Sequence, residues 1–312
     1  MTNNYHKEYP ADQAAMQAMR AELHKQPAME FGSEARPMFD ELMVKTPAAD
    51  GVSYEAATVG GVLGWWCRPA DAVEGSAILY LHGGAYVIGS AVASRNFVGQ
   101  IAMRVKAATF IAEYGLAPEH RFPGAVDDAL AVYRGLSAAG YSSLALAGDS
   151  AGGGLALSLL SLATAASQDG SVLCPSAAAV MSSWTDLALT GDSIKKRANS
   201  DPLLTRDALE KAAKLYLGEQ DPRDPRASPL YGDVTGLPPV LLHVGEEEIL
   251  LDDSRRFAER ISSVGGVAHL NVWQGMVHVF PSNIHLRAAR EALDDTGDFL
   301  RSHLEMAMPI ER

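Results

Sequence analysis

The sequence predicts an α/β fold in which helices cover both faces of a mostly parallel central sheet. The first observation is that strand-like apolar segments alternate with helix-like segments from about residue 77 onward. The second is that Ala77–Leu81 is an uninterrupted apolar run, which is typical of a strand buried on both faces. The third is composition, because a chain of 312 residues with 47% hydrophobic and 21% charged residues can bury a large core.

The segment before this alternation predicts helices and turns, followed by one hairpin. Ala11–Lys25 is rich in good helix formers. Prolines interrupt the stretch that follows it, at Pro27, Pro37 and Pro47. Gly60-Gly61 then separates two strand-like segments, Tyr54–Val59 and Val62–Cys67, which is the pattern of a β-hairpin.

The later elements follow in alternation, with one interruption. We expect strands at Ala77–Leu81, Ala108–Ala112, Leu144–Ala147, Ala177–Met181, Val240–Val244 and Ala268–Trp273. We expect helices at Ser94–Lys106, Ala125–Ala138, Leu155–Ala166, Asp252–Ser263 and His285–His303. Between Leu187 and Asp233 the chain is polar and dotted with prolines, and its clearest helix is Arg206–Leu217. A long insertion of this kind is commonly a lid or a binding element.

The charge and cysteine content exclude several classes of function. There are 26 Lys and Arg against 38 Asp and Glu residues, a net charge of −12. This surplus repels phosphate backbones and anionic lipids, so we expect no nucleic-acid partner and no membrane attachment. Cys67 and Cys174 are far apart and outside any C-x-x-C pattern, so we expect neither disulfides nor a metal site. Met1–Pro10 lacks an apolar signal segment, and no apolar run reaches about 18 residues, so the expected location is the cytoplasm.

The most informative motif is Gly148–Gly152, which reads G-D-S-A-G. It fits the G-x-S-x-G pattern, and it lies between an expected strand and an expected helix. A serine on such a tight strand-to-helix turn is exposed near the positive end of the helix, where developing negative charge is stabilised. Ser150 is therefore the predicted nucleophile.

A second motif, His82-Gly83-Gly84-Ala85, directly follows the buried strand Ala77–Leu81. An H-G-G-G loop at this place directs backbone N–H groups at the oxyanion of a tetrahedral intermediate. Here alanine replaces the third glycine. A backbone donor survives that replacement provided that the position does not need a positive φ.

A nucleophilic serine needs a base, and the base needs an orienting acid. On this kind of fold both follow the serine in the chain, the acid first. His278 is the predicted base, because it lies on a loop after the strand Ala268–Trp273, whereas the other late histidines lie in expected strands or by the last helix. The acid is expected just past the strand Val240–Val244, where Glu246, Glu247 and Glu248 follow one another. The pattern alone does not decide among these three.

Taken together, these motifs resemble those of the hormone-sensitive-lipase-like family of α/β-hydrolase esterases, in its bacterial branch. The matching segments span the chain from about the first strand onward: Tyr80–Tyr86, Tyr114–Pro123, Gly148–Gly153, Ala227–Leu230, Gly236–Pro239 and Gly275–Phe280. Two positions depart from the family pattern. Ala85 replaces a glycine, and Gly115 replaces an arginine.

The resemblance implies an α/β-hydrolase fold with a helical cap and assigns the remaining roles. The family's acid stands three residues past the glycine that ends its strand, which is Glu248 here. The oxyanion donors would be backbone N–H groups of Gly83, Gly84 or Ala85, together with Ala151. The cap would comprise residues 1–45 and 187–233, and the catalytic domain residues 46–186 and 234–312. The resemblance also suggests a homodimer.

The predicted function is a serine carboxylesterase that hydrolyses short-chain acyl esters of small molecules through a Ser150–His278–Glu248 triad and an acyl-enzyme. No cofactor is expected, because the glycine runs form neither a G-x-x-x-x-G-K-[ST] nor a G-x-G-x-x-G motif. A lactone hydrolase or a deacetylase of small metabolites could use the same site. A small-molecule receptor on the same fold is the non-enzymatic alternative, and the presence of both Ser150 and His278 argues against it.

Overall fold

The central sheet confirms the predicted α/β class. The computed structural model describes residues 2–23, 25 and 29–307, and within them the strands form one sheet in the order β1-β9-β8-β7-β6-β4-β5-β3-β2. The strands are β1 (Thr2–His6), β2 (Val52–Val59), β3 (Val62–Pro69), β4 (Ser76–Leu81), β5 (Ala108–Ala112), β6 (Ser143–Asp149), β7 (Ala178–Met181), β8 (Val240–Gly245) and β9 (Ala268–Trp273). Along the sheet from β1 through β9, β8, β7, β6 and β4 to β5, every pair of neighbouring strands is parallel. The pairs β5–β3 and β3–β2 are antiparallel.

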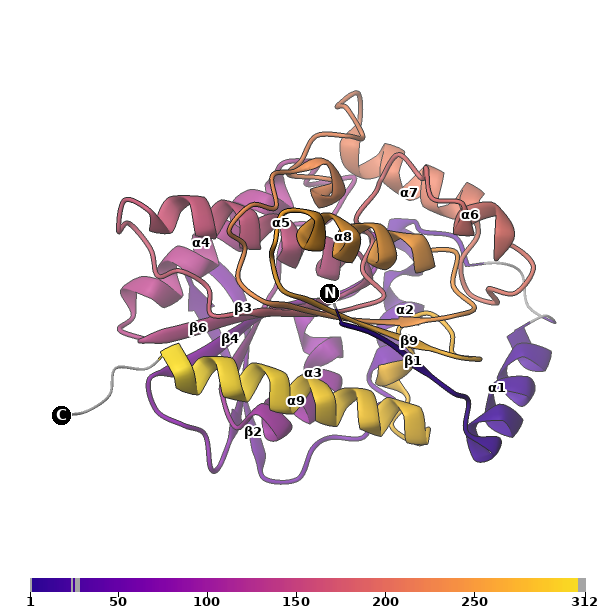
Figure 1. Ribbon diagram of the computed structural model, residues 1–312, viewed down its shortest axis with the longest axis horizontal. Helices are drawn as coiled ribbons and strands as arrows, with labels where there is room; N and C mark the ends of the chain where they lie inside the picture. Colours follow the sequence, from indigo (N-terminus) through magenta and orange to yellow (C-terminus); the bar gives the residue numbers. More distant parts are fainter. Residues whose placement is uncertain (1, 24, 26–28, 308–312) are drawn as a thin grey trace.

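Helices cover both faces of this sheet (Figure 1). Helices α4, α5 and α8 pack on one face, and α3 and α9 on the other. The helices are α1 (Pro10–Leu23), α2 (Arg36–Met43), α3 (Ala91–Val105), α4 (Gly124–Ala138), α5 (Ser150–Ser167), α6 (Ser193–Lys196), α7 (Arg206–Leu217), α8 (Leu251–Ser263) and α9 (Arg287–Ala307). Every strand and helix expected from residue 54 onward is present, most within three residues of its expected ends.

The largest difference in those later elements is the start of α5, which begins at Ser150 instead of Leu155. The three glycines at 152–154 disfavour a helix by propensity, so the sequence pattern places the start of the helix after them. Their lack of side chains is what lets the helix lie against the sheet. A Cβ on Gly152 would stand 2.1 Å from the carbonyl oxygen of Leu81, and one on Gly154 would stand 2.0 Å from that of Trp184.

Strand β1 was not predicted, because its sequence is polar and was expected to lie among helices and turns. It pairs in parallel with β9 at the edge of the sheet. Side chains fasten it there: the ring of His6 stacks on Trp273 at 3.8 Å between centroids, and Asn4 and His6 both contact the amide oxygen of Asn271. The expected helix to Lys25 ends at Leu23 in the structure, and the expectations for His24 and Pro27 lie outside the described residues.

Helix α5 combines a length of 18 residues with a high mean hydropathy, although serine and threonine residues interrupt its apolar run. Among the described residues, Ser150–Ser167 reaches the threshold of a candidate membrane span by length and composition. Its position explains the composition, because it packs between β6, β7 and α4, and 61% of the segment is buried inside the protein. The apolar run thus belongs to the core.

The strand order fixes where a ligand can bind. The chain leaves β4 to form β5 on one side and then crosses back to form β6 on the other. In open parallel sheets, binding crevices form beyond the carboxyl ends of the strands at such a reversal. Here the segments that leave those ends are His82–Ala85 after β4 and Ser150 after β6.

A buried carboxyl group joins α8 to the loop after β7. Asp253 is fully buried, and its Oδ2 atom accepts hydrogen bonds from the backbone N–H groups of Thr185 (2.7 Å) and Asp186 (2.9 Å). Burial, together with the negative charge of Asp186, raises the pKa of Asp253 to about 8, although these N–H groups and Arg256 oppose the rise. The folded protein therefore holds a proton on Asp253 at a pH where the unfolded chain has lost it.

This raised pKa predicts a specific loss of stability with pH. Between about pH 4 and pH 8 the folded state binds more protons at Asp253 than the unfolded state, so its contribution to the free energy of unfolding falls as pH rises through that window. Asp253→Asn, which mimics the protonated form, should flatten the decline. Urea unfolding of both proteins at a series of pH values measures it, with Asp252→Asn as control. Equal slopes for wild type and Asp253→Asn would contradict this account.

Candidate active site

Ser150 occupies a sharp turn between β6 and α5. Its φ of +54° lies in the left-handed region, which a non-glycine residue adopts only where its surroundings impose it. Two glycines make the turn sterically possible. A Cβ on Gly148 would come within 2.5 Å of the carbonyl oxygen of Gly152, which itself lies against the end of β4. This is the geometry that G-x-S-x-G requires, and it leaves Ser150 partly exposed at the start of the helix.

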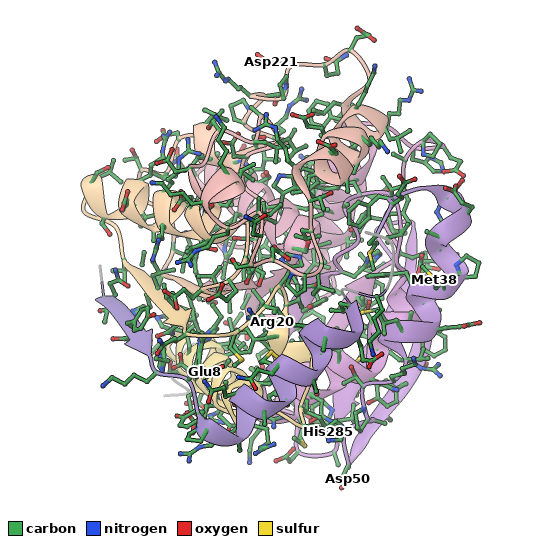
Figure 2. All side chains as sticks on the ribbon, turned by 90° about the vertical axis from the view of Figure 1, so that its right-hand side faces the viewer. Glu8, Arg20, Met38, Asp50, Asp221 and His285 are labelled. Atoms are coloured by element: carbon green, nitrogen blue, oxygen red, sulfur yellow. The ribbon has the colours of Figure 1, made fainter. Side chains whose placement is uncertain are left out.

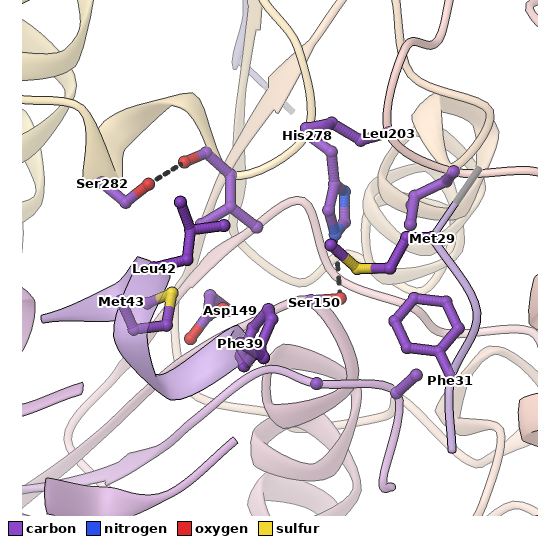
Figure 3. A pocket seen from close by; sticks show the side chains of 14 residues that line it. Met29, Phe31, Phe39, Leu42, Met43, Asp149, Ser150, Leu203, His278 and Ser282 are labelled. Atoms are coloured by element: carbon purple, nitrogen blue, oxygen red, sulfur yellow. Dashed lines mark hydrogen bonds between the residues drawn. The ribbon is translucent and has the colours of Figure 1, made fainter. Parts of the chain in front are cut away.

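The structure brings the predicted serine, histidine and glutamate into one chain of hydrogen bonds. The Nε2 atom of His278 lies 2.9 Å from Oγ of Ser150, as Figure 3 shows. On the other side of the ring, Nδ1 lies 2.8 Å from Oε2 of Glu248. His278 follows β9 on a loop, and α1 contacts that loop because Arg20 donates to the carbonyl oxygen of Gly275 at 2.9 Å. The three side chains come from segments that follow β6, β8 and β9.

Geometry distinguishes Glu248 from the two glutamates before it. Its side chain is fully buried, and Oε1 accepts hydrogen bonds from the hydroxyl of Ser182 and the backbone N–H of Gly245, each at 2.6 Å. Glu246 and Glu247 instead turn toward Arg197, at 3.4 Å and 4.0 Å. Sequence reasoning missed Ser182, whose oxygen also accepts the backbone N–H of Val279 at 2.9 Å and so links the acid to the histidine loop.

His278 lies in a strongly negative environment. Burial lowers its pKa, but the hydrogen bond and charge of Glu248, with the charges of Asp201 and Asp149, outweigh burial and raise it above the usual value. An imidazole that takes a proton from serine must then give it to the leaving group, and neighbouring carboxylates stabilise the charged form that arises in between.

The loop His82–Ala85 lies beside Ser150, but its N–H groups are not equivalent. The N–H of Gly83, one of the predicted oxyanion donors, already donates to Oδ1 of Asp149 at 3.0 Å. Tyr80 donates to the same oxygen at 2.7 Å, so Asp149 holds the start of the loop in place. Within the described residues, the N–H groups of Gly84 and Ala85 have no hydrogen-bond partner. The N–H of Ala151 lies in the first turn of α5, where no intrahelical acceptor exists.

The structure does not meet the condition stated for Ala85, because this residue adopts a positive φ. Its φ is +54°, a region that costs an alanine about 1–2 kcal/mol relative to the usual backbone conformations. Gly84 before it has a φ of +124°, and a Cβ there would stand 2.0 Å from the carbonyl oxygen of Ile88. The loop is therefore held in a strained shape at the point where Gly84 and Ala85 line the same cavity as Ser150.

A cavity of about 140 Å³ opens on Ser150 and His278 (Figure 3). Its walls are mainly apolar, and half of the lining residues come from two stretches outside the sheet. The N-terminal stretch contributes Met29, Phe31, Phe39, Leu42 and Met43, and the insertion contributes Leu203 and Leu204. Figure 2 shows α1, with Arg20, and α2, with Met38, on one side of the molecule, below the loop that carries Asp221. Sequence reasoning assigned none of these cavity residues, because an apolar residue in a cap resembles a core residue.

The described residues contain no group of three or more His, Cys, Asp or Glu side chains that could hold a metal ion. The polar residues that line the cavity are Ser150, His278, Asp149 and Ser282, and the hydroxyl of Ser282 already donates to the carbonyl oxygen of Val279. This set, with free backbone donors beside it, is suited to attack on a carbonyl carbon by an activated hydroxyl.

Comparison with known proteins identifies the family and the fold of the chain. Residues 78–282 match the model of a family described as having the alpha/beta hydrolase fold. The chain is 39% identical to an acetyl-hydrolase of Streptomyces hygroscopicus, over 80% of this chain and 82% of the relative. It is 36% identical to an esterase of Acinetobacter venetianus, over 86% and 88% of the two chains.

Solved structures give the same picture. A crystal structure of an esterase from the bacterial hormone-sensitive lipase family is 36% identical, with a TM-score of 0.87 over 95% of this chain and 99% of that one. The esterase EstE5, in a crystal soaked with p-nitrophenyl butyrate, is 36% identical with a TM-score of 0.84, over 93% and 98% of the chains. From its fold, its motifs and these relatives, the chain belongs to the hormone-sensitive-lipase-like family of α/β hydrolases.

Proposed function

We propose that the protein is a serine carboxylesterase that hydrolyses short-chain acyl esters. The observation that carries the proposal is the continuous line of hydrogen bonds from Ser150 through His278 to the buried Glu248. Relatives named esterase and acetyl-hydrolase support the same class of reaction.

In the proposed mechanism, Nε2 of His278 takes the proton of Ser150 as its Oγ attacks the ester carbonyl carbon. Glu248 fixes the imidazole with Nδ1 protonated and stabilises the imidazolium that forms. The negative oxygen of the tetrahedral intermediate is stabilised by the N–H groups of Gly84, Ala85 and Ala151. The imidazolium then protonates the departing alcohol, and a water molecule repeats the sequence on the acyl-enzyme. The N–H of Gly83 is not among the proposed donors, because it donates to Asp149 and so helps to hold the loop in place.

The size and lining of the cavity favour a small, uncharged acyl group. A volume of about 140 Å³ accommodates a group of roughly six carbon atoms or fewer, and apolar side chains form most of its walls. An acetyl or similarly short chain is therefore the proposed acyl part. The acetyl-hydrolase relative favours the same choice and extends the proposal to acetylated small metabolites.

We further propose that the cap comprises residues 1–45 and 187–233, and the catalytic domain residues 46–186 and 234–312. Support comes from the cavity walls, which include five residues between Met29 and Met43 of the first stretch and Leu203 and Leu204 of the second. Strand β1 is the exception, because it extends the sheet of the catalytic domain. Within these bounds, residues 1, 24, 26–28 and 308–312 lie outside the described residues.

The roles of the serine and the acid lead to one set of kinetic predictions. Ser150→Ala should lower kcat for p-nitrophenyl acetate by at least about 10³-fold, because the nucleophile is lost. Glu248→Gln should lower it by about 10²-fold or more, since a neutral amide neither fixes the imidazole tautomer nor stabilises the imidazolium. Glu246→Gln and Glu247→Gln are matched controls on the same loop and should stay within about threefold of wild type. Equal losses in all three glutamine variants would show that Glu248 is not the acid.

The strained Ala85 predicts a change in acyl-chain preference. Its methyl group lines the cavity, so Ala85→Gly should enlarge the acyl site and raise the ratio of butyrate to acetate turnover by about threefold or more. Lys106→Gly is the matched control, because Lys106 has a similar φ of +58° at the end of α3, away from the cavity. It should leave the ratio unchanged. If Ala85→Gly also left the ratio unchanged, the methyl group would not limit the acyl site.

A further inference from the structure

Asp201, in the insertion after β7, is a buried carboxyl group that the proposed mechanism does not use. Only 8% of the residue is exposed, and it stands just before the cavity residues Leu203 and Leu204. Asp201 belongs to no recognised motif, since Asp-Pro is ordinary at a turn.

The two carboxylate oxygens of Asp201 bind different parts of the site. Oδ2 accepts the backbone N–H of Ile249, the residue directly after Glu248, at 2.9 Å. Oδ1 accepts the N–H groups of Leu203 at 2.9 Å and Leu204 at 3.0 Å. One side chain thus joins the loop of the acid to a wall of the cavity.

Other contacts show that the insertion holds this loop along its length. The hydroxyl of Ser193 donates to the carbonyl oxygen of Ile249 at 2.6 Å, and that of Ser200 donates to the carbonyl oxygen of Glu247 at 3.4 Å. Asp201 is the carboxyl group among them: burial raises its pKa, whereas the charge of His278 and the backbone N–H groups of Ile249, Leu203 and Leu204 favour its ionised form. Hydrogen bonds to an ionised acceptor are stronger than those between neutral groups, so Asp201 contributes most to the attachment.

We propose that Asp201 is a positioning residue of the active site, which ties the placement of Glu248 to the shape of the cavity wall and adds a third negative charge near His278. This inference rests on the proposed function, since it assumes that His278 is the base. The carboxyl groups whose charges act on His278 are Glu248 after β8, Asp149 at the end of β6, and Asp201 from the insertion. Asp201 differs from the other two in belonging to the cap segment.

Neutralising Asp201 should have two separable consequences. An amide cannot accept all three N–H groups with the same strength, so the wall at Leu203 and Leu204 should loosen and KM should rise, by about threefold to tenfold. The loss of a negative charge should favour neutral His278. The acid limb of the pH profile of kcat/KM should then move to lower pH, by about half a unit.

The test compares wild type, Asp201→Asn and Asp12→Asn, with kcat and KM for p-nitrophenyl acetate measured across the acid limb. Asp12 is the matched control: it is also buried and accepts two backbone N–H groups at the start of α9, from Arg287 and Ala288, each at 2.8 Å. Asp12→Asn should lower the unfolding temperature while it leaves KM and the acid limb in place. Asp201→Asn should raise KM and move the acid limb to lower pH. An acid limb and KM equal to those of wild type in Asp201→Asn would overturn the proposal.

Asp201→Glu provides a second test of the positioning role if Asp201→Asn does not fold. It retains the charge but displaces the oxygens, so kcat/KM should fall while the acid limb stays close to that of wild type. Wild-type kcat/KM in Asp201→Glu would contradict the positioning role. These outcomes are distinct from failure of the proposed function, which Ser150→Ala with full activity would reveal independently of Asp201.

Discussion

The close approach of α5 to the ends of β4 and β6 is the constraint on which the site depends. Carbonyl oxygens of Leu81 and His82 lie where a side chain on Gly152 would be, and Gly148 packs against the same turn. Because no side chain intervenes, the first turn of α5 lies beside the loop after β4. Ser150 and the free N–H groups of that loop therefore share one space, and the strained φ of Ser150 is held by its surroundings and not by its own preference.

Negatively charged side chains surround His278. Glu248 contacts the ring of His278 directly, Asp149 orders the loop beside the nucleophile, and Asp201 fastens the acid's loop from the insertion. Each of these buried carboxyl groups accepts backbone N–H groups, which offset part of the cost of burial. The same three side chains therefore accept hydrogen bonds that order the backbone and stabilise a positively charged imidazole. The insertion thereby contributes to the chemistry as well as to the walls of the cavity.

Most of the fold could be predicted from the sequence, because buried parallel strands and their covering helices leave strong apolar patterns, as in Ala77–Leu81. Ser150 and His278 could be predicted from motif and chain order. Glu248 needed the family resemblance, because three consecutive glutamates look alike until burial separates them. Strand β1 could not be predicted: its polar residues form a strand through partners far away in the chain, such as Asn271 and Trp273. The hydrogen bond from Gly83 to Asp149 and the role of Asp201 could not be predicted either, because both arise from tertiary contacts alone.

The central claim is that Ser150 becomes acylated during turnover. The most direct measurement is mass spectrometry of the protein quenched with acid while it turns over p-nitrophenyl acetate, followed by peptide mapping. The account predicts one added acetyl group on the peptide that contains Ser150, which disappears when the substrate is exhausted and is absent in Ser150→Ala. Steady turnover with no acetyl group on that peptide, or with the group on another residue, would contradict it.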